Sequence, residues 1–184
     1  MVLPPRRCYG EILSELDREV EAWRVKNLKA IITTSYRWFV KAASSLQSPF
    51  LLLVRVYWGW QLAANGWGKL HNLPHVTEFF ASLGLPAPGP TATFVSLVEF
   101  LGGILFALGL FSRVTALAIT IDMFMAYMMA DREAFFSFSS NPDKFTGADP
   151  YFYFFAGLMI LIFGPGKLSV DYLWSHYVKK TGTG

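Results

Sequence analysis

The sequence has little charge and almost no cysteine. Of its 184 residues only 16% are charged, and the formal net charge is +3, whereas ordinary globular proteins carry about 25% charged residues. With Cys8 as the single cysteine, an internal disulfide and C-x-x-C dithiol chemistry are both excluded. So small a net charge argues against a nucleic-acid partner, which would need a strongly basic surface. No Walker loop, dinucleotide fingerprint or Ser-His-Asp order is present.

The first 48 residues contain no apolar core ahead of a small-residue cleavage site, so we expect no signal peptide. Residues 11–46 instead carry an apolar stripe at helical spacing, opposite a charged face. This pattern predicts one or two amphipathic helices on the membrane surface, with Trp23, Tyr36 and Trp38 as interface anchors. A soluble helix that packs on a partner protein would show the same stripe, so both interpretations stand.

Apolar residues make up 53% of the sequence and gather into four blocks, at residues 50–67, 93–111, 114–130 and 151–163. At about 1.5 Å per residue, the longer blocks can cross a hydrocarbon layer of about 30 Å. Turn residues separate the blocks, and the connection between the second and third is short enough to force an antiparallel hairpin. The fold class we predict is an all-α membrane protein: a four-transmembrane-helix antiparallel bundle with an N-terminal amphipathic helical extension.

Basic residues predict the orientation of this bundle in the membrane. Twelve Lys or Arg lie in residues 1–48, at Arg113 and in the tail, whereas the opposite face has three, Lys69, Arg132 and Lys144. By the positive-inside rule, both termini then lie in the cytoplasm. The predicted organisation is a cytoplasmic extension (1–48), a transmembrane domain (49–173) and a cytoplasmic tail (174–184), in a multi-pass protein of the plasma membrane.

Polar residues inside the apolar blocks are candidate functional positions, because a charge in hydrocarbon is costly. The helical rise places Glu99 about 18 Å from the cytoplasmic end of its block, level with Gln61 and about a turn below Asn65. The same estimate places Arg55 and Asp122 about 9 Å and 12 Å deep, where they are expected to form an ion pair. Glu99 would then meet only neutral partners, and it is the candidate to take up and release a proton. Alternatively, the buried charges only hold the helices in register.

We predict no metal site. His71 and His75 are four residues apart, but Pro74 lies between them in a turn-rich segment. Close packing of the second block on its neighbours is predicted from its small residues, Gly102, Gly103, Ala107 and Gly109.

Four short motifs follow one another along residues 50–173: Arg-Val-Tyr-Trp-Gly at 55–59, Asn-Gly-Trp-Gly-Lys at 65–69, Val-Glu-Phe-Leu-Gly-Gly at 98–103 and Gly-Pro-Gly-Lys-Leu-Ser-Val-Asp at 164–171. This ordered set resembles the DoxX family, whose relatives include the DoxD subunit of thiosulfate:quinone oxidoreductase. The resemblance implies a four-helix inner-membrane protein of bacteria or archaea that associates with redox or sulfur-handling partners. It also implies that Arg55, Lys69 and Glu99 match the polar positions of the family, and that Arg113 and Asp171 lie at the cytoplasmic edge of the membrane. The 48-residue extension and the outer loop at 131–150 depart from the family pattern and are possible docking surfaces.

Three functions follow as hypotheses. In the first, the chain is a membrane subunit of a quinone- or sulfur-linked oxidoreductase complex of the thiosulfate:quinone type, with quinone as the candidate cofactor and a soluble or membrane redox protein as partner. Its catalytic residues would be Glu99 and Arg55, and its ligand-binding residues Gln61, Asn65, Lys69 and Asp122. In the second, it is a non-enzymatic anchor that recruits a soluble partner through residues 11–46. In the third, it is a small proton-coupled transporter, for which four spans would need to form a homo-oligomer.

Overall fold

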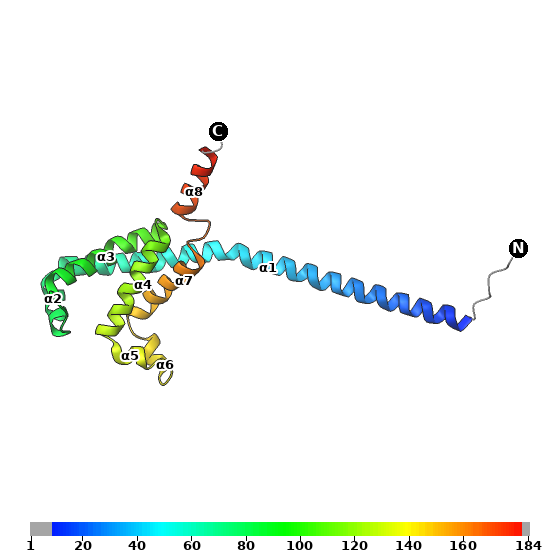
Figure 1. Cartoon of the computed structure of the whole chain (residues 1–184), viewed down its shortest axis with the longest axis horizontal. Helices are drawn as coiled ribbons and strands as arrows, with labels where there is room; N and C mark the ends of the chain where they lie inside the picture. The colour runs from blue at the N-terminus through cyan, green and yellow to red at the C-terminus, as the bar shows by residue number, and fades with distance from the viewer. Residues whose placement is uncertain (1–8, 182–184) are drawn as a thin grey trace. The chain divides into compact units, whose positions relative to one another are not determined.

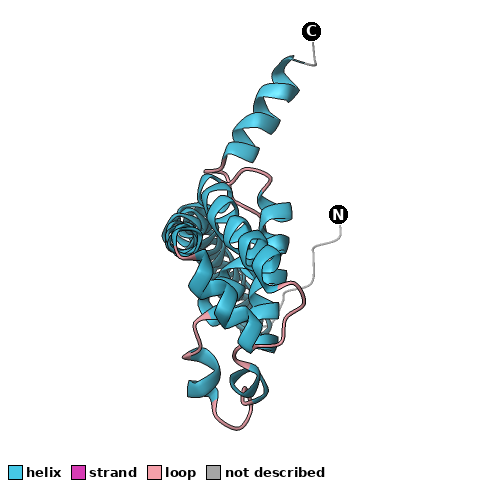
Figure 2. Cartoon of the chain, turned by 90° about the vertical axis from the view of Figure 1, so that its left-hand side faces the viewer, coloured by secondary structure: helices cyan, strands magenta, loops and turns pink. Residues whose placement is uncertain are grey.

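The computed structural model describes the backbone of residues 9–181, and every regular element in that range is an α-helix (Figures 1 and 2). The predicted all-α fold is confirmed for these residues. Cys8 lies outside the described part of the chain. Two compact units can be distinguished, Met1–Leu46 and Gln47–Gly184, and each is described by itself.

Eight helices follow along the described chain. The longest, α1, spans Tyr9–His71 and has Pro49 inside it. The structure therefore joins the predicted extension helix and the first apolar block into one helix. Proline withholds one N–H and crowds the preceding turn, which weakens α1 at this position without ending it. The other helices are α2 (Leu73–Ser82), α3 (Pro88–Leu108), α4 (Ser112–Met129), α5 (Arg132–Phe136), α6 (Pro142–Thr146), α7 (Pro150–Phe163) and α8 (Val170–Thr181).

Helix α3 is the one helix of the described chain that is long and apolar enough to cross a membrane. Helix α7 is also apolar but has 14 residues, a length of about 21 Å. Polar side chains lower the hydropathy of the other two predicted blocks: Asp122 lies in α4, and Arg55 and Gln61 lie in the second half of α1.

Helices α1 and α3 approach each other through small residues. A methyl group added at Gly59 would lie 2.7 Å from the carbonyl oxygen of Gly103 and 2.9 Å from the backbone nitrogen of Ala107. At Gly66, a methyl group would lie 2.8 Å from the carbonyl oxygen of Ser96. The two backbones are thus nearly in contact, as in the small-residue interfaces of membrane helices. This approach aligns the end of α1 with the middle of α3.

The buried core of the Gln47–Gly184 unit lies where α1, α3, α4 and α7 meet. It is formed by Leu51, Val54, Leu62, Phe106, Ala116, Ile119, Met123, Ala156 and Ile160. Helix α7 approaches α4 closely at Gly157, where an added methyl group would lie 2.6 Å from the hydroxyl oxygen of Thr120. Large apolar side chains such as Phe94, Leu101 and Val114 remain exposed around this core, as expected of helices that face lipid.

Candidate functional site

A cleft of about 1410 Å³ opens in the Gln47–Gly184 unit between α1, α2, α3, α4 and α7. Most of its lining is apolar or aromatic, and acidic, basic and amide side chains meet within it. The lining includes five of the six residues predicted as catalytic or ligand-binding: Gln61, Asn65, Lys69, Glu99 and Asp122. Three helices therefore bring these five residues to one cavity.

The cleft contains a short ion pair between α1 and α3. Lys69 Nζ lies 2.5 Å from Glu99 Oε1, and Glu99 is only 4% exposed. The prediction that Glu99 meets only neutral partners is therefore wrong. Helix α1 continues to His71 instead of ending near residue 67, so Lys69 belongs to its last turn. From there the long lysine side chain reaches the acid on α3.

Two acceptor atoms in the cleft have no hydrogen-bond partner among the described residues. They are Oε2 of Glu99 and Oδ2 of Asp122. Asp122 also interacts electrostatically with Glu99 and Lys69. The cluster thus has two carboxyl groups for one ammonium group, and it is neutral when the two acids share one proton. Because an unpaired buried acceptor is costly, these two oxygens are candidate positions for a hydrogen bond from a bound molecule.

An aromatic wall from α1 and α7 adjoins the acids. Trp58 and Phe152 stack with their ring centroids 4.9 Å apart and their planes 7° from parallel, and Tyr153 meets Trp58 edge-on at 5.7 Å. Asn65 Nδ2 donates to the hydroxyl of Tyr153 at 2.9 Å. Sequence reasoning missed Phe152 and Tyr153, because a run of aromatic residues does not show which rings face inward. The wall offers flat apolar faces to a ring-shaped ligand.

Arg55 does not line this cleft. Its side chain is fully buried near the turn between α3 and α4, and it donates through Nη2 to the backbone carbonyl of Leu168. No ion pair joins Arg55 to Asp122 within the described residues, so the predicted pair is wrong; Arg55 interacts instead with Asp171. The depth estimate located only the backbone, whereas the long arginine side chain extends along the helix to a different level.

Asp171, at the start of α8, fixes the turn between α3 and α4. Its carboxylate accepts from the backbone N–H of Phe111 at 2.8 Å and of Ser112 at 2.7 Å, and so caps the start of α4. Its own N–H donates to the carbonyl of Gly109 at 3.0 Å. Burial raises the pKa of the Asp171 carboxyl, but the hydrogen bonds from Ser112 and Phe111 and the charge of Arg55 outweigh it, so this pKa lies below its ordinary value. These contacts of Asp171 with Gly109, Phe111 and Ser112, called the clasp below, hold the start of α8 against the turn between α3 and α4.

The two histidines considered as metal ligands, His71 and His75, lie at the far end of α1 and on α2. His71 Nδ1 is 2.9 Å from the carbonyl oxygen of Trp67, and the two rings are 4.2 Å apart. His75 is the only histidine among the residues that line the cleft. No group of three or more His, Cys, Asp or Glu side chains that could hold a metal ion occurs in the described part of the chain.

Comparison with known families matches one segment of the chain. Residues 50–132 match the family model DoxX, which covers α2, α3 and α4 and the part of α1 that lines the cleft. The comparisons with curated proteins and with solved structures gave no match. All five polar cleft residues named above lie within the matched segment. Residues 50–132 are therefore similar to the DoxX family of membrane proteins.

Proposed function

We propose that this protein is a membrane subunit of a redox complex and that its cleft binds the head group of a quinone. The observation that carries the proposal is the Lys69–Glu99 pair, with unpartnered carboxylate oxygens on Glu99 and Asp122, beside an aromatic wall. A quinone head group is a flat ring with a polar oxygen at each end. The cleft offers both chemistries: ring faces on one side and a donor with two acceptors on the other.

Each polar residue has a role in this proposal. The Lys69 ammonium group donates to a quinone carbonyl oxygen, and the free oxygens of Glu99 and Asp122 accept from the hydroxyl groups of the quinol. Reduction of a quinone takes two electrons and two protons. The shared proton of the two acids is one of those protons, and the second enters from water through the open side of the cleft. Electrons come from a redox partner protein, because one cysteine cannot cycle between dithiol and disulfide.

Asn65 and Gln61 are positioning residues in this proposal. Asn65 holds the hydroxyl of Tyr153 at 2.9 Å and so fixes one ring of the wall. Gln61 lies two turns before Lys69 on α1 and lines the same cleft. Its amide can turn to donate to a carbonyl or accept from a hydroxyl. The catalytic role that the sequence suggested for Arg55 is not included, because its guanidinium group lies outside the cleft.

The proposed membrane arrangement is the four-span bundle, with both termini in the cytoplasm of a bacterial or archaeal cell. Helix α3 is long and apolar enough to cross a membrane by itself, and the apolar parts of α1, α4 and α7 pack with it around the shared core. The imbalance of basic residues supports the orientation. In this arrangement Asp171 and the clasp lie at the cytoplasmic edge, while the cleft opens from the middle of the bundle toward the opposite side.

Quinone binding by the purified protein tests this proposal. The chain, in nanodiscs, is titrated with a short-chain quinone analogue while tryptophan fluorescence is followed, since Trp58 forms part of the wall. Asp122→Asn and Glu99→Gln each remove one charged acceptor, and we expect binding to weaken roughly 10- to 100-fold in each. Glu133→Gln is the matched control, because Glu133 forms an exposed ion pair with Lys144 outside the cleft. Equal affinity in all four proteins, or no saturable binding, would overturn the proposal.

A further inference from the structure

Residues 24–46 of α1 form a basic amphipathic surface that the cleft and its chemistry do not use. This stretch holds five basic residues and no acidic one, whereas residues 11–21 hold five acidic residues and one basic residue. The two signs of charge are thus separated along the helix. A solvated helix with no partner would more commonly mix them.

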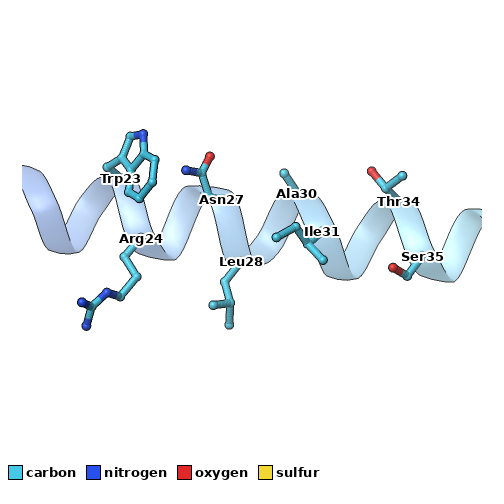
Figure 3. A pocket seen from close by; sticks show the side chains of 8 residues that line it. All are labelled: Trp23, Arg24, Asn27, Leu28, Ala30, Ile31, Thr34 and Ser35. Atoms are coloured by element: carbon cyan, nitrogen blue, oxygen red, sulfur yellow. The ribbon is translucent and has the colours of Figure 1, made fainter.

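Most of the large apolar side chains of this stretch lie on one side of the helix. At about 100° per residue, six of the eight exposed large apolar residues fall within an arc of about 140°: Leu28, Ile31, Ile32, Tyr36, Phe39 and Leu46. Trp38 and Val40 lie outside this arc. All six are strongly exposed within the first unit, from 58% at Leu28 to 70% at Phe39. Figure 3 shows part of this surface, with Leu28 on the opposite side of the helix from Asn27 and Thr34.

The basic side chains lie mainly on the other side. Lys26, Lys29, Arg37 and Lys41 fall within an arc of about 120° centred opposite the apolar residues. Arg24 is the exception, and its long side chain can extend out of the apolar arc. Thr33 and Ser45, also on the polar side, donate their hydroxyls to backbone carbonyls one turn earlier. Lys41 Nζ lies over the ring of Trp38, 5.6 Å from its centroid, and the basic arc as a whole faces away from the apolar one.

We propose that residues 24–46 dock on the anionic lipid surface of the membrane in which the protein resides. An apolar arc that bears aromatic rings and is flanked by lysine and arginine matches the boundary between acyl chains and negatively charged head groups. The position in the sequence favours this partner over a soluble one. Leu46 is four residues before the first apolar block, so the bilayer surface is always within reach, at a high effective concentration. Pro49 weakens α1 between the two segments.

Lipid charge then controls the docking. Each basic residue near an anionic surface strengthens attachment by about fivefold, so Lys26→Gln with Lys29→Gln should lower the ratio of docked to undocked helix roughly 25-fold. The same double change should have little effect on a neutral bilayer. Acidic residues 11–21 gain nothing from such a surface, so docking should end near residue 24.

Site-directed spin labelling of the full chain tests this proposal. Cys8→Ser removes the one native thiol, and nitroxides are then placed through Phe39→Cys in the apolar arc or Arg37→Cys in the basic arc. The protein is reconstituted in nanodiscs of phosphatidylcholine alone or with phosphatidylglycerol. We expect the label at 39 to be accessible to oxygen and shielded from a water-soluble nickel complex only in the anionic discs. The label at 37 should remain accessible to nickel in both.

Three results would overturn the proposal. The first is a label at 39 that is equally accessible to nickel in both lipids. The second is spin–spin broadening between copies, which would assign the apolar arc to a second chain. The third is shielding that appears only after a soluble protein fraction is added. Lys26→Gln/Lys29→Gln provides an independent check that keeps both labelled positions intact, and it should abolish the difference between the lipids.

Discussion

Removing the charge of Lys69 probes the link between α1 and α3 most sharply. Lys69→Met keeps most of the length of the side chain but leaves Glu99, which is 4% exposed, without its counter-ion. Breaking a fully buried ion pair costs about 3–5 kcal/mol. The Lys69 side chain is 37% exposed, so solvent screening reduces the expected loss to about 1–3 kcal/mol. For a chain of this size that corresponds to a fall in Tm of roughly 2–12 °C.

The assay is a double-mutant cycle followed by thermal unfolding in detergent. Lys69→Met, Glu99→Gln and the double variant are compared with the wild type. The double variant should be more stable than the sum of the two single losses predicts, because no uncompensated charge remains. The exposed pair Lys144–Glu133, 2.9 Å long, is the control and should show little coupling. An unchanged Tm in Lys69→Met, or strictly additive losses, would refute the reasoning about this pair.

Three further predictions concern the fold. Folding lowers the pKa of the Asp171 carboxyl. The ionised Asp171 therefore stabilises the fold fully at pH values above the ordinary pKa of an aspartate, and this stabilisation is lost as the pH falls through the lowered pKa. Tm should therefore fall more steeply in acid for the wild type than for Asp171→Asn. Gly59→Ala should destabilise by about 1–3 kcal/mol through overpacking, whereas Gly68→Ala, with open space around it, should be neutral or stabilising in the same melts. Gly109→Ala should cost more than Gly84→Ala: both have positive φ, +69° and +73°, but only at Gly109 would the new methyl group collide with a buried guanidinium. Equal losses at these two glycines would contradict that packing.

The helical character of the chain and the positions of its later helices could be predicted from the sequence, because apolar blocks bounded by turn residues leave few alternative folds. The predicted blocks at 93–111, 114–130 and 151–163 overlap α3, α4 and α7. The start of the first block was less well defined, since Pro49 lies inside α1 instead of at its beginning. A proline disfavours one hydrogen bond, and the packing of the rest of the helix decides whether it continues.

The candidate site was predictable in its residues but not in its pairings. Glu99 and Asp122 stood out because charges are rare in apolar segments, whereas Lys69 was selected through the family resemblance. All three line the cleft. Helical rise, however, locates a backbone and not the end of a long side chain. The depth estimate therefore missed the partners of both long side chains: Lys69 pairs with Glu99, and Arg55 interacts with Asp171. Tyr153, 88 residues from Asn65, had no sequence signal to distinguish it from its aromatic neighbours.

Photoaffinity labelling with an azido-quinone in membranes tests the central claim most directly. Irradiation followed by peptide mapping identifies the residues that contact the head group. The account predicts labelling of the cleft lining, at peptides that contain Trp58, Glu99 or Tyr153, with loss of labelling when excess quinone is added and in Asp122→Asn. Labelling confined to exposed helix faces outside the cleft, or unaffected by excess quinone, would contradict the account.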